Sequence, residues 1–409
     1  MENKIYNRWL VVVGAVICQF VLGALYTWSV FQAPIQEMFG WTAPQVSLTF
    51  SINLGIIPIL MIIAGKLLPK YGPTKMAVTG AIVLTVGLLV ASQAKELWML
   101  YLGYGVLGGA GIGIAYGIPI ATCVKWFPDK RGMISGLAVA GFGLGSVMYA
   151  PVATMLVNHF GPLNTFFVQA IYTIIGVTLG AQLMKAAPEG YVPEGWTPPA
   201  PKAGQVGPSK YDFRPSEMLR TPQYWYLLLM YTFANIAGLM IIGHASPIGQ
   251  QVAGLTPLEA GSIVSILAIL NTFGRLFWGT ISDRLGRMRV VFLMYMISAV
   301  AMFSMNYLGT FWLFALGVAM VAFTFGGAMG TFPSIAADFF GAKYVSVNYG
   351  MIFMAYSFGA IIGPRLAAVV VENTGGDYGL AFMITGVLCS IGAVMALVAK
   401  PPREPGKQS

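Results

Sequence analysis

Long apolar runs separated by short polar breaks dominate the sequence. Each run holds about 20 or more predominantly apolar residues, the length that an α-helix needs to cross the hydrocarbon core of a bilayer. The pattern predicts an all-α membrane protein with twelve transmembrane helices. We expect these spans near residues 9–34, 46–68, 75–93, 97–124, 132–157, 163–185, 223–246, 258–281, 289–308, 311–337, 346–371 and 378–399.

The longest polar break, residues 186–222, is rich in Pro and Gly. Such a composition is typical of a linker, so we predict a cytoplasmic linker between a six-helix bundle at 1–185 and a second one at 223–409. The first apolar run is too long for the core of a signal peptide and eleven more follow it, so we expect an uncleaved first span.

Composition narrows the class of protein. Hydrophobic residues make up 57% of the 409 residues and charged residues only 9%, against about 25% charged in soluble proteins. This excludes a soluble enzyme, a disordered scaffold and a disulfide-stapled secreted domain. The three cysteines, Cys18, Cys123 and Cys389, lie in apolar spans without CxxC spacing, so we expect packing roles and no metal site.

The cations predict the orientation of the chain. With both termini in the cytoplasm, 20 of the 23 Lys and Arg residues fall on the cytoplasmic side, Lys95 lies outside, and Arg275 and Arg365 lie within spans. This is the positive-inside asymmetry of a protein in a cytoplasmic membrane. This placement of cations beside the lipid bilayer accounts for the net charge of +9. No nucleic-acid partner is needed to explain the charge.

The two halves contain a repeat. The segment Gly65–Lys75 matches Gly279–Arg289 at a separation of 214 positions, and the same separation relates Gly136 to Gly350. A duplicated six-helix unit suits alternating access, in which two similar bundles move about a site held between them.

The loop at 279–289 has the form Gly-x-x-x-Asp-Arg-x-Gly-Arg. The glycine permits close helix approach, and the aspartate can pair at a helix end. This pattern resembles the loop signature of the major facilitator superfamily, which implies a transporter fold. The residues that carry it are Gly279, Asp283, Arg284, Gly286 and Arg287, with Gly65 and Gly72 in the degraded first copy.

Other segments are similar to the oxalate:formate antiporter family within that superfamily, and through it to the monocarboxylate transporters. The resemblance implies a carrier of small carboxylates that functions as a monomer and uses no cofactor. The segments are NRW at 7–9, LYTWSVFQAPI at 25–35, GIGIAYGI at 111–118, KWFPDKRGMISG at 125–136, EMLRTPQYW at 217–225 and GRLFWGTISDRLGR at 274–287.

Arg275 is the most informative single residue. No Asp, Glu or Lys lies well inside any of the twelve predicted spans, and Arg275 lies 8 residues before Asp283, roughly 12 Å along a helix and near the bilayer midplane. A guanidinium there is costly to insert and grips a carboxylate through two hydrogen bonds. We therefore expect it to bind the substrate carboxylate. The alternative is an arginine satisfied by backbone carbonyls.

Two further polar residues lie within the predicted spans and bear on this expectation. Asn271, one helical turn before Arg275, can add a hydrogen bond to the substrate or orient the guanidinium. Monocarboxylate transporters resemble this arrangement but carry an acid at that position, so the asparagine weakens the case for proton coupling through it. Arg365 follows Gly363-Pro364, and we expect it to extend to the outer interface, with a gating role as the alternative.

The family resemblance implies the rest of the site. Its residues match Leu25, Tyr26, Tyr116, Phe142, Phe325, Met329, Phe353 and Tyr356. An oxalate carrier of this family is expected to have a lysine where Tyr356 stands. One cation suits one carboxylate, so we predict a small monocarboxylate such as lactate or pyruvate.

Several functions fit these residues. The carrier could couple to protons, which we favour because a monoanion with one proton moves without net charge, or it could exchange carboxylates as an antiporter. A sensor on a carrier fold is a further alternative. No acid–base, nucleophile or metal constellation favours an enzyme, and no Walker motif favours a primary pump.

Overall fold

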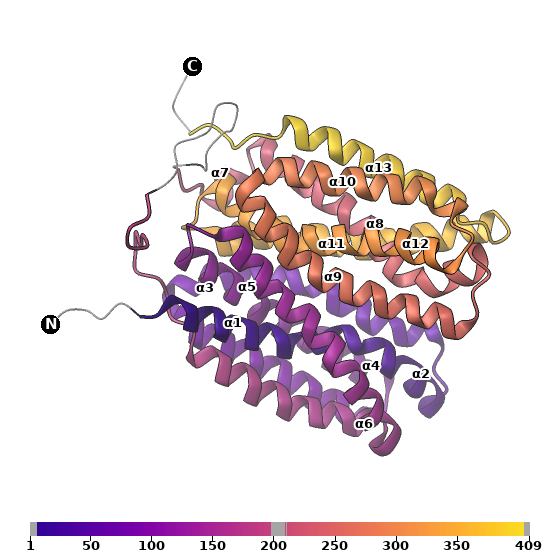
Figure 1. The fold of residues 1–409 in the computed structure, drawn as a ribbon. Helices are drawn as coiled ribbons and strands as arrows, with labels where there is room; N and C mark the ends of the chain where they lie inside the picture. The colour runs from indigo at the N-terminus through magenta and orange to yellow at the C-terminus, as the bar shows by residue number, and fades with distance from the viewer. Residues whose placement is uncertain (1–5, 198–208, 210, 405–409) are drawn as a thin grey trace. The chain divides into compact units, whose positions relative to one another are not determined.

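The apolar runs form helices throughout the part of the chain that the computed structural model describes, which is residues 6–197, 209 and 211–404. No strand occurs among these residues. Figure 1 shows the helices running in near-parallel rows within each half of the chain. The elements are α1 (Arg8–Leu22), η1 (Gly23–Thr27), α2 (Trp28–Phe39), α3 (Ala43–Ser92), α4 (Leu97–Leu100), η2 (Tyr101–Gly108), α5 (Gly109–Trp126), α6 (Arg131–Gln182), α7 (Pro215–Met218), α8 (Pro222–Val252), α9 (Pro257–Leu285), α10 (Arg287–Ser304), η3 (Met305–Tyr307), α11 (Phe311–Phe340), α12 (Val345–Asn373) and α13 (Gly379–Val398).

The twelve predicted spans all coincide with helical segments. Within the described residues, nine helical stretches are long and apolar enough to cross a membrane. Two of them, α3 and α6, contain 50 and 52 residues, which is about 75 Å if straight and enough for two crossings each. Helix α9 covers the remaining predicted span, 258–281. The chain is a multi-pass membrane protein.

Glycines divide the two longest helices. Gly72 in α3 has φ 77° and ψ 164°, and Gly161 in α6 has φ 80° and ψ 166°. A side chain is disfavoured in this backbone region, so each glycine allows the chain to turn between two spans. Gly286, which lies 214 positions after Gly72, has φ 91° and separates α9 from α10. The repeat predicted from the sequence is therefore also present in the backbone.

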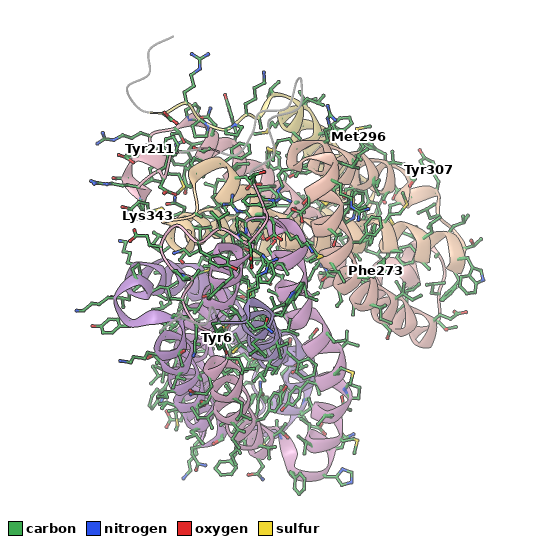
Figure 2. The ribbon with its side chains drawn as sticks, turned by 60° about the vertical axis from the view of Figure 1, so that its left-hand side comes forward. Tyr6, Tyr211, Phe273, Met296, Tyr307 and Lys343 are labelled. Atoms are coloured by element: carbon green, nitrogen blue, oxygen red, sulfur yellow. The ribbon has the colours of Figure 1, made fainter. Side chains whose placement is uncertain are left out.

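Large apolar side chains cover the outside of the helices. In the C-terminal half, Phe273, Met296 and Tyr307 are 52%, 42% and 84% exposed, and Figure 2 shows all three projecting from the surface of their helices. Such exposure would be unfavourable in water, but it suits hydrocarbon and the membrane interface.

Glycine-mediated contact holds neighbouring helices close together. A Cβ on Gly145 of α6 would lie 1.9 Å from the carbonyl oxygen of Phe20 in α1. Within the glycine-rich run at 103–117, a Cβ on Gly111 would lie 2.3 Å from the backbone nitrogen of Leu84, and one on Gly113 would lie 2.4 Å from the carbonyl oxygen of Ile57. Without side chains at these positions the backbones pack directly, as in other membrane helix pairs.

The chain divides into two compact units. One comprises Met1–Pro199 with Val345–Met351, and the other comprises Ala200–Tyr344 with Ile352–Ser409. In the first unit, Arg8 makes a bidentate ion pair with Asp129, at 2.7 and 3.1 Å, and its guanidinium lies 4.3 Å from the centre of the Phe127 ring. The pair joins the start of α1 to the residues that follow α5.

The end of the predicted linker packs against the C-terminal unit. The backbone N–H of Ser209 donates to the carbonyl oxygen of Asp338 at 2.8 Å, and that of Phe213 donates to Phe340 at 2.9 Å. Phe213 is 1% exposed. The linker residues 198–208 and 210, which include Lys202 and Lys210, lie outside the described residues, as does Lys4. Cys18, Cys123 and Cys389 are buried free thiols.

Candidate functional site

Arg275 and Asn271 form a buried pair on α9. The Nε and Nη2 atoms of Arg275 donate to Oδ1 of Asn271 at 3.1 and 2.9 Å. Arg275 is 1% exposed and Asn271 6%. The two residues lie one turn apart, so the helix itself brings the amide beside the guanidinium. Asn271 is a neutral acceptor, so its bond orients the cation without neutralising its charge.

Helix α11 supports this pair from behind. A Cβ on Gly326 would lie 1.9 Å from the carbonyl oxygen of Asn271, and one on Gly330 would lie 2.3 Å from that of Arg275. From α9 in turn, a Cβ on Gly274 would lie 2.1 Å from the carbonyl oxygen of Phe323 in α11. These three glycines bring the α9 and α11 backbones together at the level of the pair.

Three more predicted site residues of the C-terminal unit gather around a tyrosine. The hydroxyl of Tyr231 in α8 donates to the sulfur of Met329 at 3.3 Å, and its ring lies 6.2 Å from that of Phe353. Phe353 stacks on Tyr356 with ring centres 5.2 Å apart. Tyr231 also stacks on Phe332 at 4.0 Å. Met329, Phe353 and Tyr356 thus belong to one aromatic cluster.

A second aromatic cluster lies in the N-terminal unit. The Phe142 ring packs edge-on against Tyr26 at 5.1 Å and against Tyr116 at 5.3 Å. Gln19 of α1 donates to the carbonyl oxygen of Tyr116 at 3.0 Å, which fixes α5 beside α1. The structure brings these three predicted residues together.

Phe325 and Leu25 lie elsewhere in their units. The Phe325 ring packs directly against Gly238 of α8, at a distance that leaves no room for a Cβ there. Phe325 also lines a small apolar cavity between α8, α10 and α11. The carbonyl oxygen of Leu25 accepts a hydrogen bond from the hydroxyl of Tyr104 at 3.3 Å. Arg365 is exposed on α12, in contrast to Arg275.

The predicted loop motif forms an ion-pair network at the junction of α9 and α10. The guanidinium of Arg287 lies 2.7 Å from a carboxylate oxygen of Asp283 and 2.7 Å from one of Asp338. Gly286 has the positive φ that the turn between the helices requires, and Gly72 has it in the first copy. Gly65 and Gly279 are buried in their helices, whereas Arg284 is exposed.

Sequence reasoning missed two residues of these arrangements. Asp338 directly follows the predicted span at 311–337, at its cytoplasmic end. The cationic loop at 279–289 lies on the same side of the membrane in the predicted topology, so an acid at this position could have been predicted to pair with it. Tyr231 is 0% exposed and lies in a run of aromatic and apolar residues, where no signal separates it from its neighbours. Among the described residues, no group of three or more His, Cys, Asp or Glu side chains could hold a metal ion.

Comparisons with known proteins identify the family. The family model of the Major Facilitator Superfamily matches residues 11–364 and again 307–409. The chain is 34% identical to the MFS-type transporter YhjX of Escherichia coli, covering 88% of this chain and 87% of that protein. It is 31% identical to the oxalate:formate antiporter of Oxalobacter formigenes, covering 97% and 92%. The chain belongs to the major facilitator superfamily of transporters.

More distant similarities agree with this assignment. Monocarboxylate transporter 13 of Bos taurus is 27% identical over 94% of this chain and 87% of its own length. The outward-facing crystal structure of the transporter FucP superposes with a TM-score of 0.72 at 15% identity, covering 96% of this chain and all of that one. The architecture of twelve helices in two similar six-helix bundles is therefore that of the superfamily.

The glycines behind Arg275 provide a test of how the pair is held. Gly330→Ala places a methyl group against the carbonyl oxygen of Arg275, so α9 must shift away from α11. Overpacking of this kind costs about 1–3 kcal/mol, and we expect a lower thermal unfolding temperature of the purified protein in detergent. The control is Gly309→Ala, where a Cβ meets no atom within 4 Å. Equal unfolding temperatures for the two variants would contradict the close contact.

Proposed function

We propose that this transporter carries a small monocarboxylate of the lactate or pyruvate class across the cytoplasmic membrane by alternating access, with proton symport. The observation that carries the proposal is the guanidinium of Arg275, 1% exposed on a membrane-spanning helix and oriented by Asn271. A buried, preoriented guanidinium binds a carboxylate through two charge-assisted hydrogen bonds. The aromatic and methionine side chains predicted for the site, among them Met329 and Phe353, suit the apolar lining of a small-ligand site.

Position 356 favours a single carboxylate. Tyr356 stacks on Phe353 and has a hydroxyl but no charge. A dicarboxylate such as oxalate would bring two charges to a site with Arg275 as its one predicted cation, and the second carboxylate would be costly to desolvate. The similarity to an oxalate:formate antiporter supports a carboxylate as substrate, and Tyr356 is the reason for preferring a monocarboxylate.

The proposed orientation has both termini in the cytoplasm. It rests on the cations, of which 20 of 23 lie on that side in this topology. Carboxylate exchange is the second candidate mechanism, favoured by the name of the 31% identical antiporter. A sensor that binds a carboxylate without transport is the third.

The central role of Arg275 predicts a selective loss of uptake. We expect Arg275→Lys and Arg275→Gln to abolish uptake of labelled lactate or pyruvate in proteoliposomes while expression persists, because neither side chain reproduces the guanidinium fork. Arg365→Lys is the matched control, since Arg365 is exposed, and it should transport near the parental rate. Parental uptake in either Arg275 variant would remove this residue from the site.

The lack of charge at position 356 predicts a preference for monocarboxylates, which a substitution there should change. Tyr356→Lys adds a second cation, so we expect weaker uptake of monocarboxylates and a gain of oxalate binding, measured by competition against labelled substrate. Tyr307→Lys adds the same charge at a site that is 84% exposed and should leave the preference unchanged. An unaltered preference in Tyr356→Lys would mean that this position does not contribute to selectivity.

An imposed proton gradient separates symport from exchange. Proteoliposomes that contain buffer alone are given an acidic exterior, and uptake of labelled substrate is followed. We expect the substrate to accumulate against its concentration gradient. A protonophore should abolish this accumulation. Accumulation that requires an internal carboxylate would instead establish the antiport mechanism. Ligand-induced thermal stabilisation without any uptake would establish the sensor.

A further inference from the structure

The N-terminal unit contains a small cavity whose wall is mostly apolar, with Leu25 among its lining residues, and carries a few polar side chains. It lies where α1 and η1 meet α3, η2 and α6, and its space for the centre of a water molecule is about 10 Å³. Its polar lining consists of Asn53, Tyr104, Gln169 and Thr173, which are 1%, 3%, 4% and 1% exposed. No Asp, Glu, Lys or Arg is among the residues that line it.

Two of these side chains have acceptor oxygens without a donor. The Nδ2 of Asn53 donates to the carbonyl oxygen of Tyr104 at 2.7 Å, but its Oδ1 has no hydrogen-bond partner, and neither does Oε1 of Gln169. A buried acceptor left without a donor is unfavourable, because it has given up its hydrogen bonds to water and gained none in return. Two such oxygens on the wall of one cavity favour a small ligand that donates hydrogen bonds.

The cavity also lies at the junction of two irregular helical segments. The 3₁₀ segment η1 interrupts the first span, and η2 is a π-helix in the fourth. The hydroxyl of Tyr104 in η2 donates to the carbonyl oxygen of Leu25 in η1 at 3.3 Å, so the two segments are linked directly. Mid-helix 3₁₀ and π segments are frequent at functional hinges and sites, and water often inserts where a helix departs from regular geometry.

We propose that this cavity is a binding site for one water molecule, which donates to Asn53 Oδ1 and Gln169 Oε1 and holds the junction of η1 and η2. Its size suffices, because a cavity with any space for the centre of a water-sized sphere has room for at least one water molecule. A bare cation is disfavoured, since it would lose its hydration without a carboxylate to replace it.

The C-terminal unit offers a matched reference. Its small cavity is lined by Tyr295, Ser298 and Thr324 among apolar side chains. These polar groups are satisfied, because Tyr295 donates to the carbonyl oxygen of Met230 and the Ser298 and Thr324 hydroxyls lie 2.6 Å apart. Such a cavity should stay dry.

Radiolytic hydroxyl-radical footprinting of the purified protein tests the proposal, because radicals formed from a bound water oxidise the side chains beside it. Tyr104 and Tyr295 are both 3% exposed, so bulk solvent reaches them equally. We expect Tyr104 to be oxidised several-fold faster than Tyr295 in the unaltered protein. In the double variant Asn53→Leu, Gln169→Leu its rate should fall to that of Tyr295.

Two results would overturn the proposal. Equal oxidation of the two tyrosines in the unaltered protein, which needs no variant to fold, would mean that the cavity holds no water. Protection of Tyr104 and a raised unfolding temperature in NaCl, but not in choline chloride, would identify a cation instead. The experiment uses no carboxylate, so its outcome is independent of the proposed transport function.

Discussion

The hydrocarbon environment imposes one constraint from which the rest of the structure follows, namely that a polar group inside the membrane needs a polar partner. Helices satisfy the backbone, and the described helices account for all twelve spans. Side chains follow the same rule. Arg275 is held by Asn271 on the same helix, and Arg287 by Asp283 and Asp338 at a helix junction. The few buried charges and amides therefore mark the places where the chain does more than span a bilayer.

Direct backbone contact is what keeps these polar groups in place. Gly326 and Gly330 bring α11 against the carbonyl oxygens of Asn271 and Arg275, so the position of the guanidinium depends on two residues without side chains. In the N-terminal unit, Gly145 brings α6 into a similar backbone contact with α1. A carrier that changes conformation benefits from rigid units of this kind, because a bundle that moves as one body preserves its half of a site.

Much of this could be predicted from the sequence. The spans follow from apolar length, and the adjacency of Asn271 and Arg275 follows from helical spacing, because both depend on local periodicity alone. The contact between Asp338 and Arg287 joins residues 51 positions apart, and Tyr231 is one aromatic residue among many. The hydrogen bond between the Tyr104 hydroxyl in η2 and the Leu25 carbonyl oxygen in η1 likewise joins residues 79 positions apart. Interactions between distant segments have no periodic signature, so the sequence could not reveal them. The full membership of the substrate site remains a prediction.

Binding of one carboxylate by the guanidinium of Arg275 should stabilise the purified protein against thermal unfolding. Lactate, pyruvate and acetate would be compared with oxalate, in the unaltered protein and in Arg275→Gln. Monocarboxylates should raise the unfolding temperature of the unaltered protein, oxalate should raise it less, and Arg275→Gln should show no increase with any of them. Stabilisation by oxalate but not by monocarboxylates, or undiminished stabilisation of Arg275→Gln, would contradict this expectation.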